Sequence, residues 1–289
     1  MGGRPQFLIY FDACASRLFV VKERLRMDSK IFDVSPETWQ DLEIMVQQAF
    51  DEMGYESHRK YSIKTVRGSV EVDVYARKTT TPIPSIVICE CKHWNTLVSK
   101  NVIHSFRTVC SDIGAHYGLV ISKKGFQSGA EGSRESTNVH LLTFEEFQQT
   151  FFKEWQQGVF MMMSAMRDEI LPILRAKVGM QNYGLDRIDV GRLQNVEPME
   201  KYSIFNGTEG HYSEHFIQNE GFPIEINDPR GNPQELKRLT VSTHREYLEI
   251  AKQAVLDARA YFNLEPVYFE NFDKITPIRR GKSPPVTDD

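Results

Sequence analysis

Apolar residues spaced three or four positions apart mark the first predicted element, a helix that begins at Ser35 and ends at Gly54. Ser35 suits an N-cap, Pro36 suits the first helical position, and glycine commonly ends a helix. The apolar stripe of this helix, which includes Trp39, is predicted to face the core. Glu43 falls at the edge of that stripe rather than opposite it, where a surface glutamate would be expected. It is therefore a candidate functional residue.

The three segments that follow are predicted strands, at positions 55–63, 69–76 and 85–92. In the second, the valines at 70, 72 and 74 share one face and alternate with polar residues that include Asp73, which is the period of a half-buried strand. The third is an apolar run, typical of a central strand. Because the second and third strands are closely joined, we expect them to form an antiparallel hairpin.

Helices and strands continue to alternate up to position 150. Ser99 and Gly114 bound a second predicted helix, a short helix follows Gly125, and further strands are predicted at 117–122 and 139–142. A helix, three strands, a helix, a strand, a helix and a strand in this order predict an α/β fold with a mixed sheet covered by helices.

The second half of the chain is predicted to be an α+β region. A long amphipathic helix covers roughly 144–171, with Gly158 as a candidate break and Pro172 as its end. Glycine, asparagine and proline are frequent between 179 and 233, which favours loops and short strands. A further helix is predicted at 242–262.

Composition and charge limit the class of protein. The chain has 289 residues, of which 40% are hydrophobic and 26% charged, and this fits a globular protein of about two domains. The net charge of −4 excludes a protein that holds nucleic acid through its overall charge, although a local basic patch can still steer DNA. Positions 1–150 hold 18 basic and 18 acidic residues, so the negative balance lies in 151–289.

Cysteine content and the length of apolar runs bear on the compartment. The four cysteines, Cys14, Cys89, Cys91 and Cys110, are too few and too irregularly spaced for a disulfide scaffold or a zinc ribbon. No run approaches the roughly 18 apolar residues that a membrane helix needs. We therefore expect a cytoplasmic protein with no membrane partner.

Carboxylates of the first half form the most informative pattern. Glu90 follows Ile88 on one face of the predicted central strand, where an ionised carboxylate is costly unless it is paired or bound to metal. Lys92 points the same way, a hairpin can bring Asp73 alongside, and the preceding helix can lay Glu43 against the sheet. Such oxygen ligands suit Mg²⁺, which can activate water for attack on a phosphodiester while a lysine offsets the developing charge.

The alternative interpretation of these residues is structural. Glu90 and Lys92 can form an ion pair at the end of a strand, and Asp73 can cap a turn. A lone Glu-x-Lys favours this interpretation, because such tripeptides are common. The presence of Asp73 and the helical Glu43 at matching places in the pattern favours the metal site instead.

The order of these residues resembles the PD-(D/E)XK nuclease superfamily, and within it the Mrr-type restriction endonuclease catalytic domain. The resemblance rests on the helical glutamate, on Gly68-Ser-Val-Glu-Val-Asp73 and on Glu90-Cys-Lys92. It continues through Val102-Ile-His-Ser-Phe-Arg107, 114–122, 125–126 and 139–142, and covers about residues 36–150. It implies a restriction-endonuclease-like fold, in which helices flank a mixed central sheet.

The resemblance also implies roles for the site residues. Asp73 and Glu90 would bind the metal, Cys91 would contribute its backbone carbonyl, and Lys92 would be the catalytic lysine. Glu43 would hold a metal-bound water or a second ion. The implied cofactor is Mg²⁺, with Mn²⁺ as a substitute. One departure is the valine before Asp73, where relatives often have proline.

The implied substrate is double-stranded DNA. Candidate contacts to it lie near the aspartate and on the following helix: Arg67, Lys64, Arg107 and His104. A wider basic cluster fits either a solvated sheet edge or a phosphate-contacting patch. It comprises Arg59, Lys60, Lys64, Arg67, Arg77 and Lys78.

We therefore expect a metal-dependent endodeoxyribonuclease, and the resemblance implies a role in bacterial restriction or antiphage defence. Two alternatives stay open: a DNA-binding relative without catalysis, and a nuclease held silent by a C-terminal domain that senses a ligand or partner. RNA is the alternative substrate. Because paired cuts in a duplex require two active sites, a homodimer or higher oligomer is compatible with this function.

The expected organisation has four parts. Residues 1–34 are an N-terminal extension, 35–150 the nuclease domain, 151–275 a helical or α+β domain for assembly or recognition, and 276–289 a disordered tail. No motif in 151–275 specifies what that domain would recognise.

Overall fold

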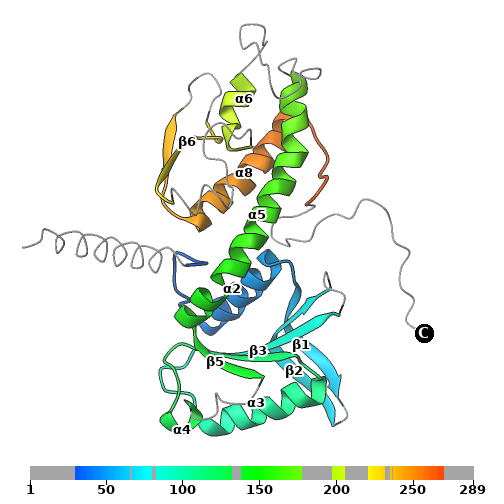
Figure 1. Cartoon of the computed structure of the whole chain (residues 1–289), viewed down its shortest axis with the longest axis vertical. Coiled ribbons are helices and arrows are strands. Elements are labelled where there is room, and N and C mark those ends of the chain that lie inside the picture. The colour runs from blue at the N-terminus through cyan, green and yellow to red at the C-terminus, as the bar shows by residue number, and fades with distance from the viewer. Residues whose placement is uncertain are drawn as a thin grey trace, which may run out of the picture.

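A computed structural model describes residues 30–65, 67–79, 83–131, 138–177, 197–205, 221–231, 235 and 237–269. Most of the expected N-terminal extension and the whole expected tail lie outside these residues. A five-stranded sheet with its helices forms one end of the molecule, and helices with a small β-hairpin form the other (Figure 1). The long helix α5 (Phe144–Lys177) runs through both ends.

The sheet has the strand order β1-β2-β3-β4-β5. Its strands are β1 (Glu56–Thr65), β2 (Gly68–Lys78), β3 (Ser85–Lys92), β4 (Tyr117–Ser122) and β5 (Val139–Thr143). The first three strands pair antiparallel and the last three pair parallel, so the sheet is mixed. Helix α3 (Lys100–Ile113) covers one face, whereas α2 (Trp39–Glu52) and α5 lie on the other (Figure 1). The predicted α/β fold is confirmed. The short helix α4 (Ser128–Glu131) follows β4.

Helix α2 begins three residues later than predicted. Its N-cap is Thr38 instead of Ser35, because Thr38 and Asp41 form a reciprocal capping box. The Asp41 N–H donates to Thr38 Oγ1 at 3.2 Å, and the Thr38 N–H donates to Asp41 Oδ2 at 2.9 Å. Trp39 is therefore the first helical residue. It is 45% exposed, so its predicted place in the buried stripe is wrong.

Hydrophobic residues pack on both faces of the sheet. On the α3 face, Ile88 of β3 packs with Ile103 and Phe106. On the other face, Cys89 and Cys91 of the same strand pack in a larger cluster that includes α2 and α5. Because side chains alternate along a strand, Glu90 shares the α3 face with Ile88, as the sequence predicts.

Strand β2 changes face in its middle. Val74 packs in the cluster with α2, whereas Val72 packs in the cluster beneath α3. The prediction that the valines share one face is therefore wrong. The change coincides with an irregularity in β1, where Lys60 has a φ of +49° and the pairing of Lys60 with Asp73 is missing from an otherwise continuous ladder. Such a left-handed residue costs on the order of 1–3 kcal/mol.

Helix α5 is a single helix of 34 residues, so the predicted break and end within it are wrong. Gly158 instead allows α5 to cross close to α2, because an added Cβ at this position would overlap with the backbone oxygen of Glu52 on α2. Pro172 lies inside the helix rather than at its end.

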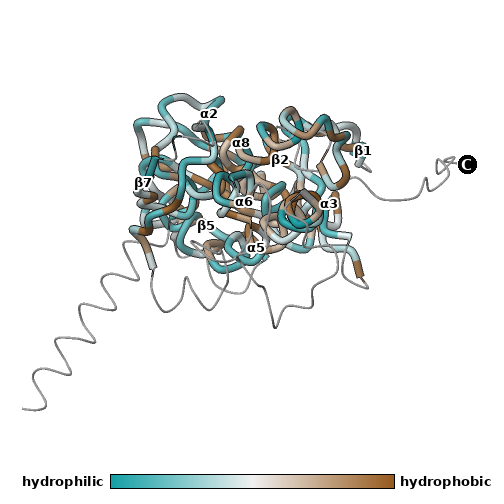
Figure 2. The backbone as a smooth tube through the Cα atoms, turned by 90° about the horizontal axis from the view of Figure 1, so that it is seen from above, coloured by the Kyte–Doolittle hydropathy of each residue, from teal (hydrophilic) through white to brown (hydrophobic). Residues whose placement is uncertain are grey.

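The C-terminal part shares its hydrophobic core with the sheet. It contains α6 (Glu197–Lys201), the 3-10 helix η2 (Ser203–Phe205), the hairpin of β6 (Ile224–Asn227) and β7 (Arg238–Val241), and α8 (His244–Phe262). Buried residues of α8 and α5 belong to the same cluster as α2 and β3. Figure 2 shows brown, apolar stretches gathered in the interior near α5, α6 and α8. In the described part of the chain, no helix combines the length and apolarity needed to cross a membrane.

Candidate active site

Strands β2 and β3 separate at Asp73. Their ladder ends with the pair of Val74 and Cys89, so Asp73 is the first residue of β2 beyond it. Oδ2 of Asp73 accepts a hydrogen bond of 2.7 Å from the backbone N–H of Cys91. This bond fixes the carboxylate beside the end of β3. Cys91, for which the sequence predicts only a carbonyl contribution, thus also holds Asp73 through its N–H.

Glu90 and Lys92 form an ion pair at the end of β3. Their side chains are 25% and 17% exposed, so the pair is only partly screened by water. Burial raises the pKa of Glu90, the hydrogen bond from Lys92 opposes this rise, and the negative charge of Asp73 adds to it. A further cation at this position would therefore stabilise the ionised form of Glu90.

Glu43 of α2 lies close enough to Asp73 for their charges to interact. Its side chain is buried, and its Oε2 has no hydrogen-bond partner in the part of the chain that the structure describes. Burial raises the pKa of Glu43 and the charge of Asp73 raises it further, whereas the charges of Lys60 and Arg59 lower it. A buried carboxylate oxygen without a partner is uncommon, and a bound water or ion is a physical explanation for it.

The donor set suits a hard divalent cation, but the side chains do not form a closed cage. Among the described residues, no group of three or more His, Cys, Asp or Glu side chains is close enough to hold a metal ion. Mg²⁺ usually takes only one or two carboxylates and completes its shell with water and phosphate. The unpartnered Oε2 of Glu43 beside Asp73 therefore fits an open site of this kind.

The predicted DNA contacts lie on β1, the turn after it, and α3. Arg67 is exposed, and its Nε pairs with Oδ2 of Asp112 on α3 at 3.3 Å. Lys64 on β1 and His104 on α3 are exposed, and Arg107 is half-buried on α3. The role of these four residues in DNA binding stays a prediction.

A contact that the sequence did not predict joins Trp39 to Lys60, a member of the wider basic cluster. Lys60 Nζ is 4.3 Å from the centroid of the Trp39 ring. Trp39 stands one helical turn before Glu43 on α2, and Lys60 is opposite Asp73 in the hairpin. The sequence placed Trp39 in the core, so it offered no signal for this contact.

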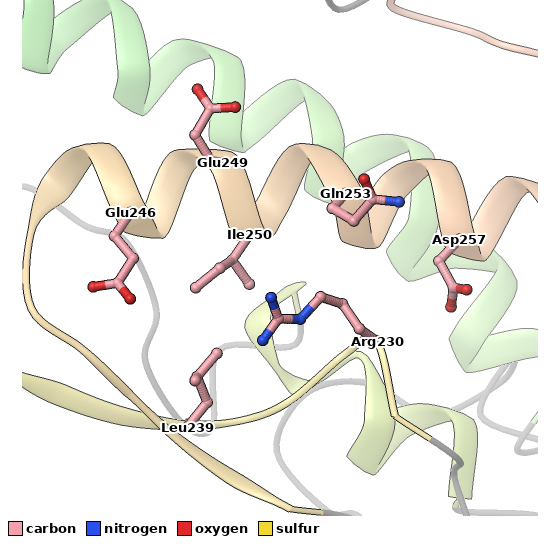
Figure 3. Close-up of a pocket in the computed structure, with 7 residues that line it drawn as sticks. All are labelled: Arg230, Leu239, Glu246, Glu249, Ile250, Gln253 and Asp257. Carbon is pink, nitrogen blue, oxygen red and sulfur yellow. The ribbon is translucent and has the colours of Figure 1, made fainter. Parts of the chain in front are cut away.

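A cavity of about 700 Å³ lies elsewhere, between α8 and the β6–β7 hairpin (Figure 3). Its lining is Arg230, Leu239, Glu246, Glu249, Ile250, Gln253 and Asp257, and includes no predicted site residue. The charged groups of this lining already have structural partners. Arg230 pairs with Asp228, and Glu246 accepts a hydrogen bond from the N–H of Ser242 before α8.

Comparison with known proteins supports the resemblance found in the sequence. Residues 35–151 match the family model Mrr_cat, which is described as a restriction endonuclease, and this confirms the resemblance over that region. A solved structure of a protein of unknown function, AF1548, is 18% identical with a TM-score of 0.32, over 37% of this chain and 57% of that one. The DNA modification-dependent restriction endonuclease AspBHI is 12% identical with a TM-score of 0.27, over 38% of this chain and 30% of that one.

The chain thus spans less than two thirds of either solved structure. No curated protein matches it.

Proposed function

We propose that residues 35–151 form a metal-dependent endonuclease domain that hydrolyses phosphodiester bonds in double-stranded DNA. The observation that carries this proposal is the position of Asp73 where β2 and β3 separate, with its charge acting on both Glu43 and Glu90. Glu90 in turn pairs with Lys92. The match of this region to a restriction endonuclease model supports the reaction class and the substrate. A role in bacterial restriction or antiphage defence is part of the proposal and rests on the resemblance.

The proposed cofactor is Mg²⁺, with Mn²⁺ as a substitute. Asp73, Glu90 and the backbone carbonyl of Cys91 would hold it, and Glu43 would hold a water beside it or a second ion. When bound, the cation lowers the pKa of water and stabilises the negative charge that develops on the phosphate.

Each side chain has its own task in orienting the reactants. The N–H of Cys91 keeps the Asp73 carboxylate in place. Glu90 holds the Lys92 ammonium through their ion pair, so that a positive charge stands beside the reacting phosphate. The buried Oε2 of Glu43 can accept a hydrogen bond from the attacking water, since no donor of the described residues occupies it.

The direct test is cleavage of plasmid DNA by the full chain with Mg²⁺ and with EDTA. Asp73→Ala and Lys92→Ala are each expected to reduce cleavage by at least about a hundredfold, the usual scale for a transition-state contact. Lys153→Met, which changes an exposed lysine on α5, is the matched control and should cleave like the wild type. Cleavage that survives both site substitutions contradicts the mechanism.

A DNA-binding relative without catalysis is the second candidate. The Glu90–Lys92 ion pair favours it, because the two charges satisfy each other without a cation. This candidate predicts that the full chain retains duplex DNA without cutting it in Mg²⁺, Mn²⁺ or any other divalent cation. Parallel cleavage assays on RNA of the same sequence test whether the substrate is DNA or RNA.

The proposed role of residues 151–275 is assembly or recognition, including control by an activating ligand or partner. A homodimer would supply the two active sites that paired cuts require. Light scattering of the purified full chain, with and without duplex DNA, measures the oligomeric state. A monomer in both conditions that still makes paired cuts contradicts this part of the proposal.

A further inference from the structure

A fault in the β1–β2 hairpin lies directly across from Asp73. The ladder pairs Arg59 with Val74, omits Lys60 and Asp73, and resumes at the next residue of β1. Lys60 has a φ of +49°, a left-handed conformation that residues other than glycine seldom adopt. Because residues held in such conformations cluster at functional sites, Lys60 is a candidate for a functional role.

The side chain of Lys60 rests on an exposed aromatic ring. Its Nζ lies 4.3 Å from the centroid of Trp39, which is 45% exposed at the start of α2. Glu43 follows one turn later on the same helix. A contact with the ring face holds the ammonium beside the candidate active site and leaves its N–H donors available.

Three other basic side chains of this region pair with carboxylates: Lys78 with Glu154, Arg67 with Asp112, and Lys92 with Glu90. Arg59, next to Lys60, donates from its Nε to Oε1 of Gln47 at 3.2 Å. Within the described ranges, no carboxylate forms an ion pair with Lys60. Its charge acts on Glu43 without a direct ion pair, so its ammonium can still contact an external anion. The anion that a nuclease site brings to this position is a phosphodiester.

We propose that Lys60, positioned by Trp39, binds a backbone phosphate of the substrate strand beside the scissile bond. This inference rests on the proposed function, because it takes duplex DNA as the ligand. Trp39 acts as a positioning residue, since its ring fixes where the ammonium stands. The left-handed backbone at Lys60 directs the side chain toward α2. Such a contact fixes the position of the duplex without reading its sequence.

The test measures duplex binding by the full chain in EDTA over a series of salt concentrations. Each phosphate contact contributes about 0.9 to the slope of log K against log salt concentration. Lys60→Met is expected to lower that slope by about 0.9, and Lys60→Arg to restore it. Trp39→Leu should weaken binding, because the ammonium is no longer held. Lys153→Met should leave the slope unchanged.

A second variant, Lys60→Gly, separates the charge from the backbone strain. Glycine accepts a positive φ, so this variant is expected to unfold at the same or a higher temperature while its slope falls as in Lys60→Met. If both variants keep the slope of the Lys153→Met control, the phosphate site is wrong even when the wild type cleaves DNA. A wild type that binds duplex with the expected slope but never cuts overturns the proposed function and leaves the phosphate site standing. A full chain that does not bind duplex DNA overturns both.

Discussion

The two ends of helix α2 bury a glutamate in opposite ways. Glu43, near the start, leaves Oε2 without a hydrogen-bond partner among the described residues, and its pKa is raised. Glu52, in the last turn, accepts hydrogen bonds of 2.7 and 2.6 Å from Arg245 and one of 2.6 Å from Trp155 Nε1. Burial alone would raise the pKa of Glu52, but the charge of Arg245 holds it below its usual value. We infer that Glu52, whose two oxygens have hydrogen-bond partners, stabilises the fold. Glu43 keeps one oxygen that can accept a hydrogen bond from a ligand.

The partners of Glu52 come from the C-terminal part. Arg245 and Lys252 are on α8, and the Arg245 guanidinium also lies 4.4 Å from the centroid of the Phe32 ring. Nε of Arg245 donates to the backbone oxygen of Ile31 at 2.9 Å. Helix α8 therefore contacts both α2 and the segment that precedes it.

The largest expected effect on stability concerns Glu52, in the last turn of α2. Arg245→Ala leaves the charge of Glu52 buried with too few partners, so the free energy of unfolding should fall by about 3–5 kcal/mol. Urea unfolding of the full chain measures this. The double variant Glu52→Met with Arg245→Met removes both members of this pair, leaves Lys252 paired with Glu249, and should cost much less. If the single variant loses less free energy of unfolding than the double variant, the contrast between the two glutamates is wrong.

A smaller loss is expected where α5 crosses the same end of α2. Gly158→Ala places a methyl group against the backbone oxygen of Glu52, so the helices must shift apart. Overpacking of this kind costs about 1–3 kcal/mol, measurable as a lower urea midpoint. Gly129→Ala on α4 is the matched control, because an added Cβ there meets no atom within 4 Å. Equal midpoints for the two variants would show that the crossing tolerates a larger side chain.

The smallest change in stability is expected at Glu43, near the start of α2. Glu43→Gln keeps the shape and removes a charge that burial and Asp73 both disfavour, so the free energy of unfolding should change by no more than about 1 kcal/mol. DNA cleavage should fall by about 10- to 100-fold, as when a group that supports a metal is lost. Urea unfolding and plasmid cleavage of the same preparation test both expectations. Destabilisation as large as that of Arg245→Ala would make Glu43 a structural residue.

Local patterns were sufficient to predict most of the sheet and the grouping of three site residues. The apolar runs of β3 and β4 have the predicted bounds, and Ser99 and Gly114 flank α3 as predicted. Asp73, Glu90 and Lys92 lie on two neighbouring strands, so strand parity and a short hairpin are enough to bring them together. Their chemical roles remain predictions.

Features that depend on contacts between distant segments were not predictable in this way. The β2 face change coincides with the left-handed Lys60 on another strand, and no residue type marks that position, because the sequence there has no glycine. The start of α2 was missed for a local reason instead, because the prediction placed the N-cap at Ser35 and overlooked the capping box of Thr38 and Asp41. The partner of Glu52 is separated from it by 193 positions, so no local spacing reveals the pair.

That separation also has a consequence for the order of folding during synthesis. Arg245 is made 193 residues after Glu52. At about 5–20 residues per second, the gap corresponds to roughly 10–40 s. Once residue 151 has been made, the nascent segment 35–151 contains its strands and its acids but still lacks the guanidinium that pairs with Glu52. The region that resembles a nuclease is therefore translated before the residue that completes the packing around Glu52.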